Sequence, residues 1–291
     1  MEANIKTVSA VLDAPAPHMV GDGFRVNNFF PKGHRIKMSP FFLLDYNAKT
    51  TFSARNEPRG VGVHPHRGFE TVTLAYHGAV AHHDSAGNSG VIRAGDVQWM
   101  TAASGILHKE YHEETFSREG GIFQMVQLWV NLPAKYKMSS PKYQEIKQND
   151  MAKYNLPDAG GVLEIIAGEY LGLKGTASTF TPIHVYNVRL NKSGKATLSF
   201  PAGYNTGLMI IEGVITVNGS DTAKVDQFVY FNQDGSEIEI EATEDSIVLV
   251  LSGEPIDERI TQYGPFLMNT PEEITEAIND YNQGKFGYLE E

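Results

Sequence analysis

Short apolar segments broken by glycine recur along the first half of the chain. They include residues 69–76 (FETVTLAY), 90–100 (GVIRAGDVQWM), 105–114 (GILHKEYHEE) and 121–132 (GIFQMVQLWVNL). Each segment has the length of a strand and is bounded by turn-forming residues. Several short strands with glycine-bearing turns are typical of a β-sandwich or a small barrel. The pattern therefore predicts an all-β fold.

The second half of the chain repeats this texture after a polar interruption. Residues 134–161 are lysine-rich and lack apolar periodicity, so we read them as a connector with at most a short helical turn. Strand patterns resume at Gly168, and residues 206–219 (TGLMIIEGVITVNG) end in Asn218-Gly219, a strong hairpin signal. At 291 residues the chain is long enough for two cores. We therefore expect two consecutive domains, residues 1–140 and 141–291.

One helix is predicted, at the C-terminal end of the second domain, over residues 271–283. Thr270 is a suitable N-cap, Pro271 occupies the first helical position and Glu273 completes a capping-box pattern. Apolar residues then recur with helical spacing from Ile274 to Tyr281. This helix is expected to pack against the domain and to carry no chemistry.

Two pairs of metal-competent side chains stand out in the first half. His64 and His66 flank Pro65 in HPHRGFE, and His108 and Glu110 flank Lys109 in SGILHKE. Residues i and i+2 of a strand point to the same face, so each pair can present both side chains to one point. We therefore predict a single metal site held by His64, His66, His108 and Glu110.

The predicted donor set is three imidazoles and one carboxylate, and the chain has no cysteine. Such ligands suit one divalent transition metal, Fe(II), Mn(II), Co(II), Ni(II), Cu(II) or Zn(II), without choosing sharply among them. Four protein ligands leave open positions on an octahedral ion, where substrate or dioxygen can bind. The second half has a single histidine, His184, and no HxH pair. The expected chemistry therefore belongs to the first domain alone.

Composition narrows the possible partners. The net charge is −11, and Lys and Arg do not cluster, so we expect no direct nucleic-acid binding. The chain contains no apolar run of spanning length, and its first residues do not form a signal-peptide pattern. We accordingly predict a cytoplasmic protein that does not enter a membrane.

Other polar and aromatic residues have plainer readings. His82 and His83 are adjacent, so they point to opposite faces of a strand, and the following Asp84-Ser85 suggests a turn; a structural or rim role is expected. His112 continues the face of His108 and Glu110 and is a candidate neighbour of the site. A group of large apolar residues is suited to a planar ligand but is expected to be mostly core. The group is Phe69, Trp99, Met100, Phe123 and Trp129.

Several longer blocks together resemble the pirin family, a branch of the cupins. The blocks are HPHRGFETVT from His64, HHDSAGNSG from His82, AGDVQWMTAASGILHKE from Ala94, QLWVNLP from Gln127 and YGPFLMNTPEEI from Tyr263. The resemblance implies two consecutive cupin-type β-barrels, each a double-stranded β-helix or jelly roll. It also implies a non-haem metal, commonly iron, held by His64, His66, His108 and Glu110. Ala103 departs from the family, whose members commonly carry Gly there. Glu70 stands where many other cupins have a carboxylate ligand, and the resemblance implies that Glu110 is the carboxylate ligand instead.

The resemblance implies two functions from different classes. The first is a dioxygenase similar to quercetin 2,3-dioxygenase, an oxidoreductase that opens a flavonol or related polyphenol with O2, in which Glu110 stays a ligand or acts as a base. The second is a non-catalytic metal or redox sensor that binds protein partners, which the acidic composition favours over DNA. Both functions require the same metal site.

Overall fold

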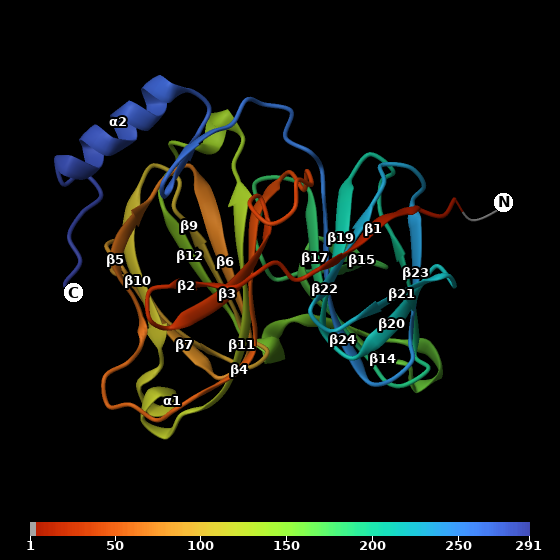
Figure 1. Cartoon of the computed structure of the whole chain (residues 1–291). Helices are drawn as coiled ribbons and strands as arrows, with labels where there is room; N and C mark the ends of the chain where they lie inside the picture. The colour runs from red at the N-terminus through yellow and green to blue at the C-terminus, as the bar shows by residue number, and fades with distance from the viewer. Residues whose placement is uncertain (1–3) are drawn as a thin grey trace. The chain divides into compact units, whose positions relative to one another are not determined.

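The computed structural model describes residues 4–291 and is built almost entirely of β-strands, as predicted (Figure 1). It divides into two compact units, which are described separately below. The first unit comprises Ala16–Gly33, Phe41–Gln148 and Ile256–Glu291. The second comprises the described residues up to Pro15 together with His34–Pro40 and Asn149–Pro255.

These units interleave along the chain, in contrast to the consecutive division into residues 1–140 and 141–291. The connector expected after residue 134 is partly strand: Lys142–Ile146 pairs with Val97–Thr101 of the first unit, and Ala152–Asn155 pairs with Gly161–Ala167 of the second. Both are edge strands with exposed polar positions, so their composition resembles that of a linker.

The first unit contains two main sheets. The larger has the strand order β12 (Lys142–Ile146), β9 (Val97–Thr101), β6 (Phe69–His77), β11 (Gly121–Asn131), β4 (Phe41–Phe52), β3 (Phe24–Phe30) and β2 (His18–Val20). The smaller has the order β5 (Gly60–His66), β10 (Ile106–His112), β7 (Ala79–Asp84) and β8 (Ser89–Arg93). A buried apolar cluster takes Phe24 and Phe123 from the larger sheet and Val80 and Ile92 from the smaller. The core of the unit therefore lies between its two sheets.

The second unit repeats this plan. Its larger sheet has the order β1 (Val8–Asp13), β22 (Gln227–Phe231), β19 (Asn205–Glu212), β24 (Ser246–Gly253), β17 (Ile183–Leu190), β14 (Gly161–Ala167) and β13 (Ala152–Asn155). Its smaller sheet has the order β18 (Lys195–Ser199), β23 (Glu237–Ala242), β20 (Val214–Val217) and β21 (Asp221–Lys224). A two-stranded ribbon joins β15 (Glu169–Tyr170) to β16 (Leu173–Lys174). The predicted Asn218-Gly219 turn connects β20 and β21, with positive φ at both residues.

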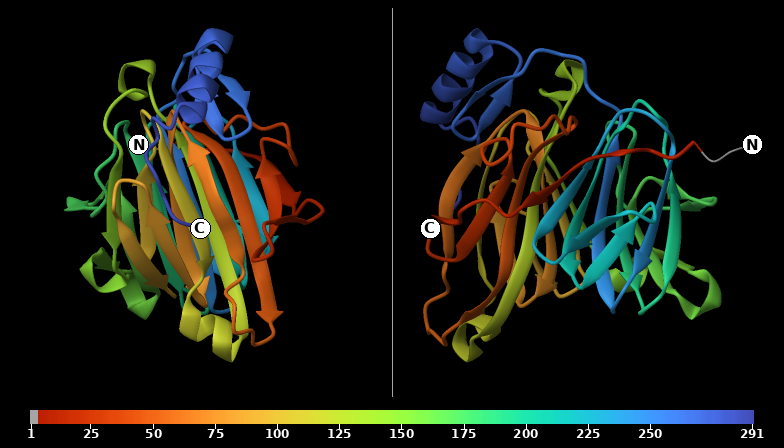
Figure 2. Two further views of the ribbon diagram at one scale, coloured as in Figure 1. Left: turned by 90° about the vertical axis from the view of Figure 1, so that its left-hand side faces the viewer. Right: turned by 45° about the vertical axis from the view of Figure 1, so that its right-hand side comes forward.

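The C-terminal helix α2 (Pro271–Asn282) confirms the predicted element. Thr270 and Glu273 form the reciprocal capping box, in which each side chain accepts from the other residue's backbone N–H. Ile274 and Ala277 are buried against the ribbon β25 (Thr261–Tyr263) and β26 (Phe266–Met268). The helix and ribbon belong to the first unit, and Figure 2 shows α2 beyond one end of that unit's strands.

The remaining helices are short. They are α1 (Glu114–Glu119) and the 3-10 turns η1 (Ala134–Tyr136), η2 (Gln148–Asp150) and η3 (Pro157–Ala159). Within residues 4–291 no helix has the length and apolarity needed to span a bilayer.

A buried lysine ties three parts of the first unit together. Lys137 is 1% exposed, and its ammonium donates to the carbonyls of Gly68 (2.7 Å) and Leu267 (2.8 Å) and to Oδ1 of Asn131 (2.6 Å). Gly68 has a φ of 92°, and an added Cβ there would overlap the Leu267 carbonyl. This close approach holds β26 against the turn that follows β5.

His112 lies in an aromatic cluster. Its ring contacts Phe24, Phe52, Phe116 and Phe123, and its Nε2–H donates to the Gly23 carbonyl at 2.9 Å. Burial lowers the pKa of His112 to about 4. The ring is therefore neutral in the folded protein at pH 7.

Acid should destabilise the protein through His112. Because the folded pKa lies below the unfolded value near 6.5, the unfolded chain binds more protons between pH 6.5 and pH 4, and stability falls as the pH drops through that window. The shift corresponds to up to about 3 kcal/mol. Urea unfolding of wild type and His112→Phe at pH 7 and pH 4 should show a smaller acid-dependent loss in the variant. Equal losses in the two proteins would contradict this assignment.

Candidate metal centre

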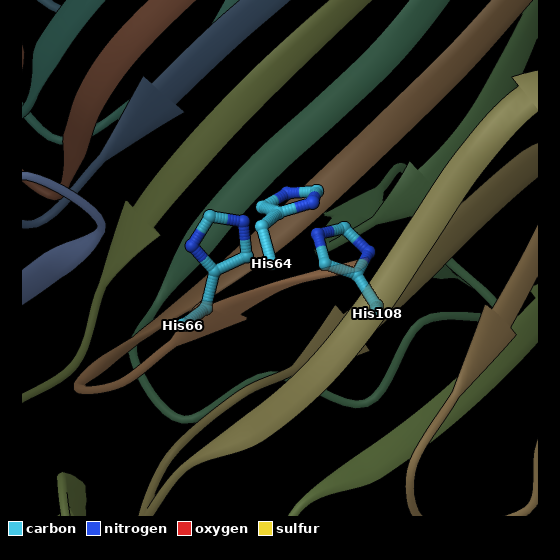
Figure 3. A group of neighbouring side chains, drawn as sticks. All are labelled: His64, His66 and His108. Carbon is cyan, nitrogen blue, oxygen red and sulfur yellow. The ribbon is translucent and has the colours of Figure 1, made fainter. Parts of the chain in front are cut away.

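Strands β5 and β10 bring His64, His66 and His108 together. They pair antiparallel, with His108 opposite His64 and Ile106 opposite His66. Because side chains alternate along a strand, His64 and His66 lie on the same face of β5, next to His108 on β10. The three rings gather in Figure 3.

The three histidines form a compact group. The ring centroids of His64 and His108 are 4.2 Å apart, those of His66 and His108 are 4.7 Å apart and those of His64 and His66 are 4.8 Å apart. One nitrogen from each ring lies within 4.8 Å of the others. A group of this size can hold a metal ion.

Glu110 lies beside the three histidines. Its carboxylate groups with His82 and His108, again within 4.8 Å, and not with His64 and His66. The register of β5 and β10 shifts between His108 and Glu110, so that Glu110 lies opposite Val61. The extra residue lies in β5, between Val61 and His64, so Glu110 keeps the face of His108 on β10. The role of Glu110 as fourth ligand therefore stays a prediction.

Three neutral donors hold the Glu110 carboxylate. Thr73 Oγ1 and Gln98 Nε2 each donate to Oε1 at 3.0 Å, and Gln127 Nε2 donates to Oε2 at 2.7 Å. These three residues come from β6, β9 and β11 of the facing sheet. These hydrogen bonds fix the orientation of the carboxylate.

The ring nitrogens suit metal binding. His64 Nδ1 donates to the Gly62 carbonyl at 2.8 Å, and His66 Nδ1 donates to the Pro265 carbonyl at 3.3 Å. In a neutral imidazole, Nε2 of each ring then carries a lone pair that is available to a metal. Nε2 of His108 is buried without a hydrogen-bond partner among the described residues. An orphaned buried nitrogen beside two available lone pairs is the arrangement that a metal would satisfy.

Burial keeps these rings in the form that binds metals. It lowers the pKa values of His66 and His108 well below the usual range, and the neighbouring histidines lower both further. Metal ligation requires the neutral imidazole. The two residues are therefore ready to coordinate at neutral pH without releasing a proton.

His82, which the sequence assigned to a structural or rim position, is fully buried beside the cluster. Its ring stacks on Tyr143, and strand β7 places it opposite Glu110 on β10. His83 points to the other face, as expected, and stacks on Tyr111. His82 is placed in the site by the pairing of β7 with β10, and the period-2 alternation of the sequence does not reveal that pairing.

Aromatic rings flank His66. Phe69 lies 5.0 Å and Trp129 5.4 Å from its ring centroid, and these two stack on each other at 4.2 Å. Phe69, Trp99, Met100 and Phe123 are fully buried core residues, whereas Trp129 is partly exposed. Of the proposed aromatic set, Phe69 and Trp129 are the members in contact with His66.

A small cavity adjoins the cluster. It has a volume of about 30 Å³ and is lined by Asp45, Val61, His64, Glu110, Gln127 and neighbouring apolar side chains. This is room for a water molecule, whereas a site for a drug-sized ligand typically encloses about 300 to 1,000 Å³. A multi-ring molecule reaching this point requires lining side chains to move.

Three other residues noted in the sequence lie beside or outside the cluster. Glu70 is buried, accepts a hydrogen bond from Thr101 at 2.7 Å, and has its pKa raised by burial to about 7. His112 belongs to neither candidate metal group. Ala103 adopts a φ of 41°, a left-handed conformation that glycine tolerates more readily, in the loop before β10.

Comparison with known proteins places this architecture. The family model described as pirin matches residues 23–130, and the pirin C-terminal cupin domain matches residues 185–287. A Pseudomonas aeruginosa protein named putative quercetin 2,3-dioxygenase is 46% identical over 285 residues, covering 97% of this chain and 99% of that protein. The chain belongs to the pirin family. The cupin-type bicupin fold predicted from the sequence is thereby confirmed.

Other pirins and a solved structure agree. Pirin of Homo sapiens is 35% identical over 274 residues, covering 92% of this chain and 90% of the human protein. A crystal structure of a protein named quercetin 2,3-dioxygenase from Acinetobacter baumannii is 47% identical, with a TM-score of 0.92, and the match covers 98% of this pirin and 100% of that chain.

Proposed function

We propose that this pirin is a metal-dependent dioxygenase that cleaves quercetin or a related flavonol with O2. The observation that carries the proposal is the triad of His64, His66 and His108 with the unpartnered Nε2 of His108. Support from relatives is the 46% identity to a protein named putative quercetin 2,3-dioxygenase and the 47% identity to one named quercetin 2,3-dioxygenase, each over nearly the whole chain.

In this proposal His64, His66 and His108 hold one divalent ion, with Glu110 as fourth ligand. Fe(II) is the proposed metal, and Mn, Co, Ni, Cu or Zn also match nitrogen and oxygen donors. The ion supplies Lewis-acid and redox chemistry toward the phenolate and O2. The proposed substrates are a polyphenol and O2. We also propose that the protein resides in the cytoplasm.

Glu110 either stays bound to the ion or leaves it to act as the base. Its carboxylate lines the small cavity beside His64, where a substrate hydroxyl can approach, and Thr73, Gln98 and Gln127 hold both of its oxygens. A positioned carboxylate within hydrogen-bond reach can accept the hydroxyl proton. The proton then resides on a Glu110 oxygen, and Phe69 and Trp129 offer apolar surface near His66 to an aromatic substrate.

The test is O2 consumption by Fe(II)-loaded protein given quercetin. We expect uptake that requires quercetin and metal and that is lost in His66→Ala. His83→Ala is the matched control, because His83 lies on the opposite face of the neighbouring strand β7 and should leave uptake intact.

The outcome that would contradict the enzyme is a wild type that retains its metal yet consumes no O2 above the metal-free control. That result would favour the non-catalytic sensor, which needs access only for small ions and whose affinity for a protein partner should then change with the metal's redox state or occupancy.

A further inference from the structure

A chain of buried polar groups leads away from the histidine triad. Asp84, His82 and His108 are each no more than 3% exposed. His82 Nε2 lies 3.3 Å from Oδ2 of Asp84, and His82 Nδ1 lies 3.5 Å from Nδ1 of His108. The far nitrogen of His108, Nε2, is the orphaned atom of the metal group.

The proton positions along this chain follow from its ends. The Asp84 carboxylate is an acceptor, so His82 donates to it from Nε2–H. The Nε2 amide of Gln98 donates to the Glu110 carboxylate at 3.0 Å, which fixes that atom as the nitrogen, and it also lies 3.2 Å from His82 Nδ1. His82 Nδ1 therefore carries a lone pair and accepts.

His108 is the remaining link. Its Nδ1 lies 3.5 Å from the His82 Nδ1 lone pair, which Gln98 also approaches at 3.2 Å; because two facing lone pairs repel, the proton is assigned to Nδ1 of His108. A neutral imidazole protonated at Nδ1 has its lone pair at Nε2. Asp84 therefore determines, through His82, which nitrogen of His108 carries the lone pair that faces the metal group.

We propose that Asp84 and His82 are positioning residues that fix the tautomer of His108, so that Nε2 of His108 is the nitrogen that binds the metal. This inference rests on the proposed metal site but not on any reaction performed there. His64 and His66 reach the same tautomer by a simpler route, through the carbonyls of Gly62 and Pro265. His108 alone uses a histidine and a carboxylate, which makes its ligation sensitive to substitutions outside the ligand set.

Asp84 is itself held in place. Its Oδ1 accepts the backbone N–H groups of Ala86 and Asn88, each at 2.9 Å, and Nδ2 of Asn88 lies 2.9 Å from Oδ2. The turn after β7, read from the sequence only as a turn, therefore orients the carboxylate. Tyr143 stacks on the His82 ring, with the ring centroids 5.0 Å apart and an interplanar angle of 16°. Asp84, His82 and His108 are called the relay below.

Asp84→Asn is the sharpest variant. The amide is isosteric, and its oxygen can keep the turn contacts of Oδ1 while its NH2 replaces the acceptor Oδ2. His82 must then carry its lone pair at Nε2 and its proton at Nδ1. Two N–H donors, on His82 Nδ1 and His108 Nδ1, would then face each other. Ni(II) affinity, measured by chelator competition, should fall roughly 10- to 100-fold, the usual effect of losing a partner behind a metal ligand.

Two further variants separate the relay from simple packing. His82→Phe keeps a ring beneath Tyr143 and removes both nitrogens, so Ni(II) affinity should fall similarly. His82→Asn restores an acceptor near the Nδ1 position and should recover most of the affinity. His83→Phe, at the adjacent position facing away, is the matched control and should bind Ni(II) as wild type does.

Tautomers can also be read directly. Long-range 1H–15N spectra of 15N-histidine protein without metal should show the Nε2–H form for His82 and the Nδ1–H form for His108, and Asp84→Asn should reverse the first. The opposite tautomers in wild type, or unchanged Ni(II) affinity in folded Asp84→Asn, would overturn the proposal. Two Ni(II) ions per chain, with one lost in His82→Phe, would also overturn it by making His82 a ligand.

These results are independent of turnover. Wild type that binds Ni(II) tightly, loses affinity in Asp84→Asn and shows no quercetin-dependent O2 uptake would support the relay and contradict the dioxygenase. Normal uptake with unchanged affinity in Asp84→Asn would do the reverse.

Discussion

His108→Ala should abolish metal binding and reduce quercetin-dependent O2 uptake to that of metal-free protein. His108 is fully buried, belongs to both candidate groups and carries the unpartnered nitrogen. Loss of a partner behind a ligand already costs roughly 10- to 100-fold in affinity, so loss of the ligand itself should cost more than about 100-fold. Titration with Ni(II) or Fe(II), followed by chelator competition, measures the effect.

His112→Phe is the matched control for this variant. Both histidines are buried on β10, but His112 is enclosed by phenylalanines and belongs to neither metal group. Metal should raise the melting temperature of wild type and His112→Phe, since a ligand that binds only the folded state stabilises it, and should leave that of His108→Ala unchanged. A metal-induced rise in folded His108→Ala equal to that of wild type would remove His108 from the site.

Lys137→Met should destabilise the protein, and by more at pH 9 than at pH 7. The variant leaves the carbonyls of Gly68 and Leu267 and the Asn131 side chain without their buried donor. An unsatisfied buried acceptor costs about 1 to 3 kcal/mol. Removing the amine also removes the cost of burying it, so we expect a net destabilisation of about 3 kcal/mol.

The pH dependence follows from the lysine itself. Burial lowers the pKa of Lys137 to about 7, with Glu258 and Glu273 opposing that shift. Between pH 7 and about 10 the unfolded chain binds more protons at this site than the folded one, so the wild type gains stability as the pH rises. The methionine variant lacks that gain. Urea unfolding at both pH values measures the difference, with exposed Lys135→Met as the control; a destabilisation that shrinks toward pH 9 would contradict the assignment.

Local pattern was enough to predict the triad. The HxH pair and His108 depend only on period-2 alternation and on two strands being neighbours, and β5 and β10 do pair. Glu110 and His82 required more. Glu110 keeps the face of His108, and its partners Thr73, Gln98 and Gln127 come from the facing sheet, whose position local alternation does not reveal.

The division into units was harder to predict for a related reason. Strands β1 and β12 read locally as a terminal segment and a polar linker, and their assignment depends on pairing with β22 and β9. Strand pairing over such separations is set by tertiary packing, which intrinsic propensity does not encode. The helix α2, by contrast, follows from a cap, a proline and a stripe that all lie within a dozen residues.

Interleaving has a consequence for biosynthesis. The ribosome makes Ile256–Glu291 after the rest of the first unit, yet this segment supplies β25, β26 and α2 to that unit, and its Pro265 carbonyl orients His66. The same segment provides the Leu267 carbonyl that Lys137 binds. A nascent chain that has emerged only as far as residue 140 therefore has all three histidines but lacks the contacts that complete their unit. The proposed metal site is accordingly expected to be complete only after residues 256–291 have been synthesised.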